Sequence, residues 1–293
     1  MQQPVRRRSC LTVPGGSDKM LVKAHGLDAD EIVFDLEDAV APDDKTAARE
    51  KVAALLATPA WVQRTVAVRI NGIGTVWWRD DIAALAGLAH PQLTLVVPKV
   101  ESASDFDTLE QHLGAREAES GRGPKIGLQG LIETAGGLVR VAEIAGASER
   151  LQSLILGYAD LASSLGRGVE GDWSFAQNMI VLAARANGLQ AIDGPYFAFG
   201  ESQEPALVAR SMAVAGLGFD GKWAIHPSQI GTINAAFTPG EAEVAQARGI
   251  VAALDAARAA GNGATTYEGG MIDEAMRAGA ERILVRADER VWL

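Results

Sequence analysis

The sequence alternates eight times between a short β-rich apolar run and a longer segment with the amphipathic pattern of a helix. This alternation constrains the fold more than any other feature, because strands separated by helices pair in parallel. The predicted strands are 9–14, 31–38, 65–71, 94–101, 125–133, 151–160, 190–197 and 222–227. Helical segments between them include KTAAREKVAALLA, VWWRDDIAALAGLA, SASDFDTLEQHL and FAQNMIVLAARANG. The pattern predicts a mixed α/β chain folded as a (β/α)8 TIM barrel. A doubly wound open sheet is the alternative, but the turn VPGGSDK after the first strand lacks the GxGxxG spacing that it would need.

The chain continues beyond the eighth predicted strand, which suggests a second structural part. We expect residues 1–238 to form the barrel and residues 239–293 to form a C-terminal helical extension. The extension contains a helix near 240–260, a Gly-rich link (AAGNGATTYEGG) and a last short helix (MIDEAMRAGAERIL). Glycines in such a link are typical of a hinged arm, so the extension is predicted to act as a lid or to reach a neighbouring subunit.

Charge and composition exclude several classes of function. The formal net charge of -10 argues against general binding to nucleic acid or to an anionic membrane. A single cysteine, Cys10, excludes an intramolecular disulfide framework, and its apolar surroundings indicate a small core residue. The sequence has no signal-like segment and no apolar run approaching the ~18 residues of a membrane span, so we predict a cytoplasmic protein. The basic cluster near the start of the chain is either a solubilising segment or a local anion site; it comprises Arg6, Arg7, Arg8, Lys19 and Lys23.

Polar side chains gather at the carboxyl ends of the predicted strands, where TIM-barrel enzymes have their active sites. They are Asp35, Glu37, Asp38, Arg69, Asn71, Lys99, Glu101, Glu133, Asp160, Asp193 and His226. Glu133 and Asp160 end neighbouring strands and would meet at one edge. Two carboxylates with room for water and substrate suit Mg²⁺, or Mn²⁺, in an open site. The alternative is that these acids serve only as helix N-caps.

The other strand-end residues suggest how such a site would work. Arg69 offers a permanently charged fork for a carboxylate or a developing oxyanion. Glu37 and Asp38, on the DLED turn, would bind the water molecules of the metal or orient a base. Lys99 is compatible with a fixed cation, with an ion pair to Glu101, or with Schiff-base chemistry. His226, followed directly by Pro227, is compatible with a general base or with a role in fixing the loop.

Other catalytic classes find no support in the sequence. Cys10 has no recognisable His/Asp relay, and the serines of GYADLASS do not follow a nucleophile-elbow pattern. The sequence contains neither CxxC nor HExxH, so a zinc site is not indicated.

Six motifs then resemble a known family. They are RRSCLTVPG, FDLEDAV followed by Lys45 and Ala48-Arg49, VRIN, LIET, LGYADL and KWAIHP. In this order they resemble the citrate lyase β-subunit-like group of the acyl-CoA lyase/aldolase family, which includes malyl-CoA and citramalyl-CoA lyases. The resemblance runs from about residue 7 to residue 285.

The resemblance implies a (β/α)8 barrel that assembles as a homotrimer or hexamer, with Mg²⁺ bound by Glu133 and Asp160. It implies that Arg69 contacts the bound acid and the enolate oxygen, and that Asp273 of the MID motif enters the site of the neighbouring subunit as general acid/base. The implied path of coenzyme A or substrate comprises Thr12, Lys19, Lys23 and the backbone of Ile225 and His226. The sequence departs from the family pattern at Thr12, where an aromatic residue is frequent, and after Asp273, where MIDEAM replaces the usual proline-containing continuation.

The reaction implied is a Mg²⁺-dependent Claisen-type cleavage of a 3-hydroxyacyl-CoA, such as malyl-CoA or citramalyl-CoA, into acetyl-CoA and a 2-oxo acid, or its reverse. Three alternatives remain open from the sequence. They are a citrate lyase β subunit that needs an acyl-carrier partner, a metal-dependent aldolase acting on free 2-oxo acids, and an acyl-CoA thioesterase.

Overall fold

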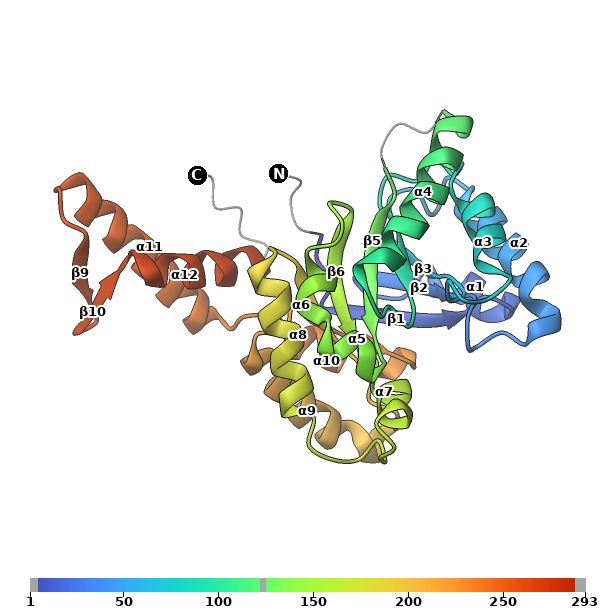
Figure 1. Cartoon of the computed structure of the whole chain (residues 1–293). Coiled ribbons are helices and arrows are strands. Elements are labelled where there is room, and N and C mark those ends of the chain that lie inside the picture. The colour runs from blue at the N-terminus through green and yellow to red at the C-terminus, as the bar shows by residue number, and fades with distance from the viewer. Residues whose placement is uncertain (1–4, 122–124, 288–293) are drawn as a thin grey trace. The chain divides into compact units, whose positions relative to one another are not determined.

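The computed structural model describes residues 5–121 and 125–287, and its central element is a closed barrel of eight parallel strands in chain order. The strands are β1 (Ser9–Pro14), β2 (Glu31–Asp35), β3 (Val66–Arg69), β4 (Leu93–Val97), β5 (Gly127–Ile132), β6 (Leu151–Leu156), β7 (Gln190–Asp193) and β8 (Gly221–Ala224). Strand β1 pairs with both β2 and β8, which closes the ring. The predicted (β/α)8 barrel is confirmed (Figure 1).

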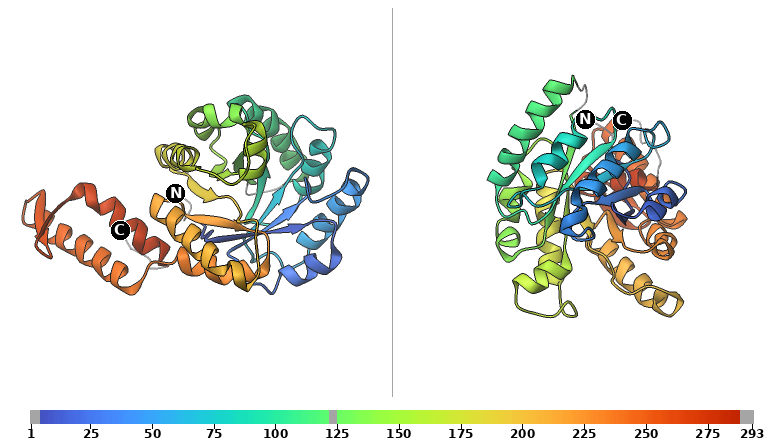
Figure 2. Two further views of the ribbon diagram at one scale, coloured as in Figure 1. Left: turned by 90° about the horizontal axis from the view of Figure 1, so that it is seen from below. Right: turned by 90° about the vertical axis from the view of Figure 1, so that its right-hand side faces the viewer.

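Helices follow the strands and lie on the outside of the barrel (Figure 2). They are α1 (Asp18–Ala24), α2 (Lys45–Leu56), α3 (Trp78–Leu85), α4 (Ala103–Ser120), α5 (Ala135–Val139), α6 (Val141–Ala145), α7 (Tyr158–Ser164), α8 (Ser174–Ala186), α9 (Glu204–Leu217) and α10 (Ile230–Ala236). Three short 3-10 turns, η1 (Pro42–Asp44), η2 (Glu201–Gln203) and η3 (Pro227–Gln229), precede α2, α9 and α10. Because the helices shield the outer face of the sheet, the strands read as nearly continuous apolar runs.

Several strands end earlier than the sequence pattern predicted. Strand β2 stops at Asp35 because its carboxylate accepts hydrogen bonds from the backbone N–H groups of Glu37 (2.8 Å) and Ala39 (3.3 Å), which turns the chain. Strand β6 stops at Leu156, and Asp160 lies in the first turn of α7 instead of at the strand end. Of the polar residues predicted at strand ends, Asp35, Arg69 and Asp193 are the last residues of β2, β3 and β7, and the others belong to the loops and helix starts of the barrel rim.

One buried residue from each strand meets in the barrel interior. These eight residues are Cys10, Val33, Ala67, Val96, Leu131, Ile155, Ile192 and Trp223. They form an apolar layer of the kind that fills TIM barrels. Cys10 thus has the core position expected for it.

A polar layer lies two residues earlier along the strands, towards their amino ends. Glu31 accepts hydrogen bonds from Arg7 (2.7 Å) and Gln129 (3.0 Å), and Gln129 also bonds to Thr94 (2.8 Å) and Ser153 (2.9 Å). The ion pair with Arg7 balances the charge of Glu31 through its Oε1, while the buried Oε2 has no hydrogen-bond partner among the described residues, and the layer closes this end of the barrel.

The chain divides into two compact units, residues 1–234 and 235–293. The second unit contains α11 (Glu241–Ala259), the antiparallel strands β9 (Ala264–Tyr267) and β10 (Gly270–Asp273), and α12 (Glu274–Arg286). Its helices pack through a small core of Val244, Ala247, Ala280 and Leu284.

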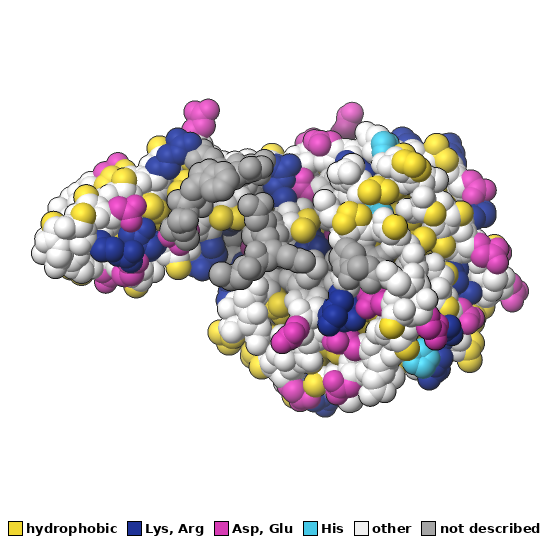
Figure 3. All heavy atoms as spheres, turned by 90° about the horizontal axis from the view of Figure 1, so that it is seen from above, with side chains coloured by type: hydrophobic (Ala, Val, Ile, Leu, Met, Phe, Trp, Pro, Cys, Tyr) yellow, Lys and Arg dark blue, Asp and Glu magenta, His cyan; other side chains and the backbone are white. Residues whose placement is uncertain are grey.

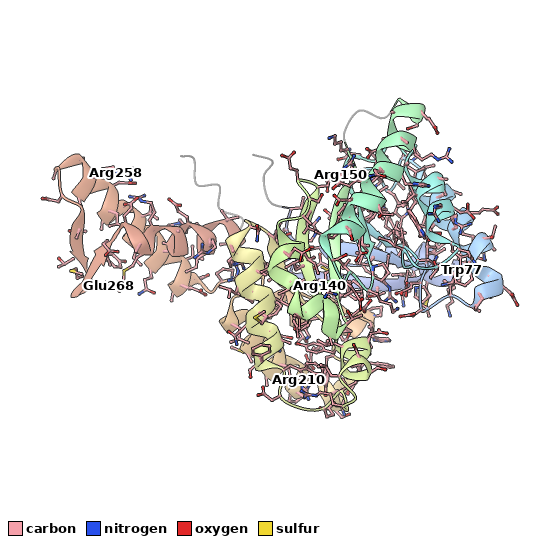
Figure 4. The ribbon with its side chains drawn as sticks, in the orientation of Figure 1. Trp77, Arg140, Arg150, Arg210, Arg258 and Glu268 are labelled. Carbon is pink, nitrogen blue, oxygen red and sulfur yellow. The ribbon has the colours of Figure 1, made fainter. Side chains whose placement is uncertain are left out.

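The Gly-rich segment of this unit is a β-hairpin, not the hinged link that the sequence suggested. Glu268 and Gly269 both have positive φ (47° and 81°), as a two-residue type I′ hairpin turn requires. Glu268 lies at the tip of the hairpin (Figure 4). The last helix accordingly begins at Glu274, with Asp273 as its N-cap, and not at Met271.

None of the helices in the described ranges is both long enough and apolar enough to cross a lipid bilayer.

Candidate active site

A cavity of about 390 Å³ opens above the apolar layer, at the carboxyl ends of the strands. Side chains on a strand alternate between its two faces, so a residue two positions after an inward-facing core residue also faces inward. Five residues that line the cavity each lie two positions after a residue of the core layer. The lining residues are Thr12, Asp35, Arg69, Glu133 and Ile225, which follow Cys10, Val33, Ala67, Leu131 and Trp223 respectively.

Glu133 and Asp160 both line this cavity. Strands β5 and β6 are paired up to Ile132 and Leu156, so Glu133 follows the end of one strand and Asp160 lies in the first turn after the other. Glu133 is buried, and its pKa is raised to about 8 by burial and by the negative charges of Glu37 and Asp160. The two acids therefore lie close enough to repel each other electrostatically.

The donor set fits a hard divalent cation. Over the described ranges, no group of three or more His, Cys, Asp or Glu side chains is arranged to hold a metal ion, so the candidate is the pair Glu133 and Asp160. Mg²⁺ commonly takes one or two carboxylates and completes its coordination with water and substrate oxygens. A buried carboxylate whose charge is disfavoured by its neighbours gains the most when a cation binds.

Arg69 is fixed in the cavity by Asp35. Its Nε donates to Asp35 Oδ1 (2.9 Å) and its Nη2 donates to Asp35 Oδ2 (2.5 Å), a two-point contact that sets the plane of the guanidinium. Nη1 lies 3.0 Å from Glu37 Oε2, and the guanidinium carbon lies 5.8 Å from the centre of the Trp223 ring. Burial opposes the charged form, but the charge and hydrogen bonds of Asp35 outweigh it and raise the pKa of Arg69.

Glu37 and Asp38 lie on the loop after β2, beside two basic residues. Glu37 is buried and contacts Arg69 on one side and Lys99 on the other, whereas Asp38 is half exposed and lines the cavity. Lys99 thus pairs with Glu37 and not with Glu101. Burial opposes the charge of Lys99, but the hydrogen bond and charge of Glu37 outweigh it and raise its pKa, which disfavours the neutral amine that a Schiff base needs.

Other residues implied by the resemblance lie outside this cavity. Lys19 and Lys23 are exposed on α1, which follows β1, and do not line the cavity. The ring of His226 stacks on Phe199 (4.7 Å between ring centres), and its Nδ1 lies 2.8 Å from Ser228 Oγ.

Basic and acidic side chains are interspersed over the face that Figure 3 shows.

The backbone of Ile225 and His226 is held by one side chain. Their N–H groups donate to Gln229 Oε1, at 2.9 and 3.3 Å, so Gln229 fixes the loop after β8. Gln229 itself donates to the carbonyls of Tyr196 and Ala198. The side chain of His226 caps η3, a structural role that the proline after it had suggested.

Asp273 belongs to the second compact unit. Its Oδ1 accepts a hydrogen bond from the N–H of Ala275 (3.0 Å) at the start of α12. The residue is partly exposed at the end of β10.

Two polar residues of the cavity had no individual role assigned from the sequence. Asp35 holds Arg69, and Tyr158 lines the cavity while its hydroxyl donates to Asp193. The signal for Asp35 was its place at the end of β2, but the DLED turn offers several acids and sequence alone does not say which one faces inward. Tyr158 carried no comparable signal beyond its place in the LGYADL motif.

Comparisons with known proteins decide the family. The family model described as HpcH/HpaI aldolase/citrate lyase matches residues 8–227. The chain belongs to the HpcH/HpaI aldolase/citrate lyase family. This confirms the resemblance inferred from the motifs and the prediction that the chain is an enzyme of the lyase class.

Individual members of the family are similar over nearly the whole chain. An L-malyl-CoA/beta-methylmalyl-CoA lyase from Rhodobacter capsulatus is 38% identical, over 97% of this chain and 96% of its own length. A (3S)-malyl-CoA thioesterase from Cereibacter sphaeroides is 37% identical, over 96% of this chain and 94% of its own length. The crystal structure of CitE from Mycobacterium tuberculosis in complex with magnesium, acetoacetate and coenzyme A has a TM-score of 0.75 and 32% identity, covering 97% of this chain and 99% of that one.

Proposed function

We propose that this chain is a Mg²⁺-dependent acyl-CoA lyase. It would cleave, or form, a 3-hydroxyacyl-CoA such as malyl-CoA or citramalyl-CoA, with acetyl-CoA and a 2-oxo acid as the other side of the reaction. The observation that carries the proposal is the meeting of Glu133, Asp160 and Arg69 in one cavity at the carboxyl end of the barrel. The names of the relatives, a malyl-CoA lyase and a magnesium- and coenzyme A-bound CitE, support the same chemistry.

Glu133 and Asp160 would hold the cation, with Mn²⁺ as a possible substitute. A cation held there would supply Lewis-acid stabilisation of the negative charge that develops during cleavage. Arg69, held rigid by Asp35, would present a fixed positive charge to the thioester oxygen as the carbon–carbon bond breaks. Thr12 on β1 and Ile225 after β8 also line the cavity and would position the acyl group.

Asp273 would exchange the proton with the acetyl carbon. Its Oδ1 is engaged by the N–H of Ala275, so we assign proton transfer to Oδ2. We further propose that the second unit delivers Asp273 to the cavity of a neighbouring copy, in a trimer or hexamer. The basic residues of α1, Lys19 and Lys23, would meet the phosphates of coenzyme A outside the cavity.

A thioesterase is the second candidate, because one relative of this chain, 37% identical, bears that name. A cavity that stabilises a thioester oxyanion also favours hydrolysis if a water molecule takes the place of the carbon nucleophile. The two reactions release different products, so one assay separates them.

The test uses the purified full chain alone with malyl-CoA or citramalyl-CoA and Mg²⁺. We expect a 2-oxo acid without release of free thiol, and loss of activity in a chelator. Glu133→Gln and Asp160→Asn should each lower kcat/KM by about 10²–10³-fold, the usual cost of removing a group that stabilises a transition state. Free thiol without 2-oxo acid would identify a thioesterase. Absence of both products from every thioester would contradict the proposal and favour a carrier-dependent subunit.

A further inference from the structure

Lys99, in the turn after β4, has an unusual backbone conformation. Its φ of 53° lies in the left-handed region, which residues other than glycine rarely adopt. Within the described ranges, Glu268 is the other non-glycine residue with positive φ, and its hairpin turn explains it. Strained residues of this kind persist where the surrounding structure imposes them, and they concentrate at functional sites.

The strained backbone of Lys99 contacts Glu133 directly. The N–H of Lys99 donates to Glu133 Oε1 at 3.0 Å. This bond fixes one carboxylate oxygen. The other oxygen, Oε2, lies beside Gly157, and a Cβ added to Gly157 would be only 2.7 Å from it. The orientation of the Glu133 carboxylate is thereby set from the main chain of Lys99.

The side chain of Lys99 reaches three other acids. Its ammonium contacts Glu37 Oε1 and lies 3.7 Å from Asp38 Oδ1 and 3.9 Å from Asp160 Oδ1. Lys99 itself does not line the cavity. We therefore expect it to act through the acids that it contacts and not by touching a substrate in the cavity.

Lys99 changes the charge balance of the acids around the cavity. Asp35 is neutralised by Arg69, and Glu37, buried between the two basic residues, is neutralised by Lys99. This leaves Glu133 and Asp160 as the two carboxylates whose charge would be balanced by a divalent cation. Asp38, with a side chain 55% exposed, is screened by water.

We propose that Lys99 is a positioning residue for the cation site: its main chain orients Glu133, and its ammonium keeps Glu37 out of the ligand set. The inference rests on the proposed cation site and adds the reason why that site has two carboxylates and open positions. Without the ammonium, the buried carboxylate of Glu37 would turn to the cation as a third ligand. It would then occupy a position that the substrate needs.

This predicts tighter Mg²⁺ binding together with slower turnover when the ammonium is removed. In Lys99→Met, which keeps the backbone N–H, the Mg²⁺ dissociation constant measured by calorimetry should fall about tenfold, because the freed Glu37 carboxylate is no longer neutralised and can bind the cation. The kcat for the thioester should fall as well. General damage to the site would weaken Mg²⁺ binding instead. Lys99→Arg should keep the wild-type dissociation constant, and so should Lys125→Met, which removes an exposed lysine before the amino end of β5.

A double variant tests the role of Glu37. In Lys99→Met/Glu37→Gln the tightening should disappear, because the freed ligand is no longer charged. An unchanged or weaker Mg²⁺ affinity in Lys99→Met, with circular dichroism showing a folded chain, overturns the inference but leaves the proposed function standing. If Lys99→Met does not fold, Lys99→Gln takes its place with the same expectation. If the wild type binds no Mg²⁺, the cation site fails and this inference fails with it.

Discussion

Gly157 determines how closely the end of β6 approaches Glu133. A Cβ at this position would lie 2.6 Å from Glu133 Cβ and 2.7 Å from Glu133 Oε2, closer than non-bonded atoms allow. In Gly157→Ala we therefore expect the carboxylate of Glu133 to move and Mg²⁺ affinity to fall about tenfold or more, since a small displacement of one ligand is costly at a rigid site. Calorimetric titration with Mg²⁺ measures this.

Gly216 in α9 supplies the matched control. An added Cβ there meets no atom within 4 Å, so Gly216→Ala should leave Mg²⁺ affinity unchanged and raise the free energy of unfolding by about 0.5–1 kcal/mol. Equal Mg²⁺ affinity in Gly157→Ala and the wild type would show that Glu133 is not a ligand in the position described.

At the residue scale, the sequence located the two acids that line the cavity better than the ion-pair partners of the basic residues. Glu133 and Asp160 could be found because each follows an apolar run, and parallel strands bring such ends together. The ion-pair partners of the basic residues could not be found from the sequence. Lys99 pairs with Glu37, which is 62 positions away, and not with Glu101 two positions away, because the left-handed backbone at Lys99 redirects the chain.

At the scale of elements, α2 holds the loop that carries Glu37. Lys45 at the start of α2 is buried, and its Nζ donates to the carbonyls of Leu36 (2.8 Å) and Glu37 (2.6 Å). Lys45→Met would leave both carbonyls without this donor. Each unsatisfied buried group costs about 1–3 kcal/mol, so we expect the free energy of unfolding in urea to fall by about 2–4 kcal/mol.

Lys51 lies on the same helix and serves as the comparison. Its side chain is 40% exposed and pairs with the exposed Asp18, so Lys51→Met should change the free energy of unfolding by less than about 1 kcal/mol. If Lys45→Met were as stable as Lys51→Met, the loop after β2 would have to be held by other contacts.

The ends of elements were the least predictable part of the fold. All eight barrel strands could be located because their apolar runs are buried on both faces. Strands β9 and β10 were missed, because their alternating exposure and flanking glycines resemble a flexible link. The turn signal was weak, because Glu268 stands at the first turn position, where a type I′ turn usually has Asn, Asp or Gly before the final glycine.

At the scale of the whole molecule, the barrel follows from local patterns but the use of the second unit does not. Strand order, the inward alternation and the position of the cavity all result from parallel pairing within one chain. Whether Asp273 serves its own barrel or that of another copy depends on contacts between chains, on which periodicity and composition carry no information.

Mixing two inactive variants resolves this question. Asp273→Asn lacks the proposed acid/base and Glu133→Gln lacks a cation ligand, so each homo-oligomer should be inactive. If the second unit acts across a subunit boundary, co-expressed random mixtures in equal amounts should regain about a quarter of wild-type activity, because a site works when an intact barrel meets an intact Asp273 from its neighbour. If each Asp273 serves its own barrel, no mixture recovers activity, since every chain carries one defect. Light scattering on the same samples verifies that the subunits have assembled, and recovered activity in a monomeric fraction would contradict the model.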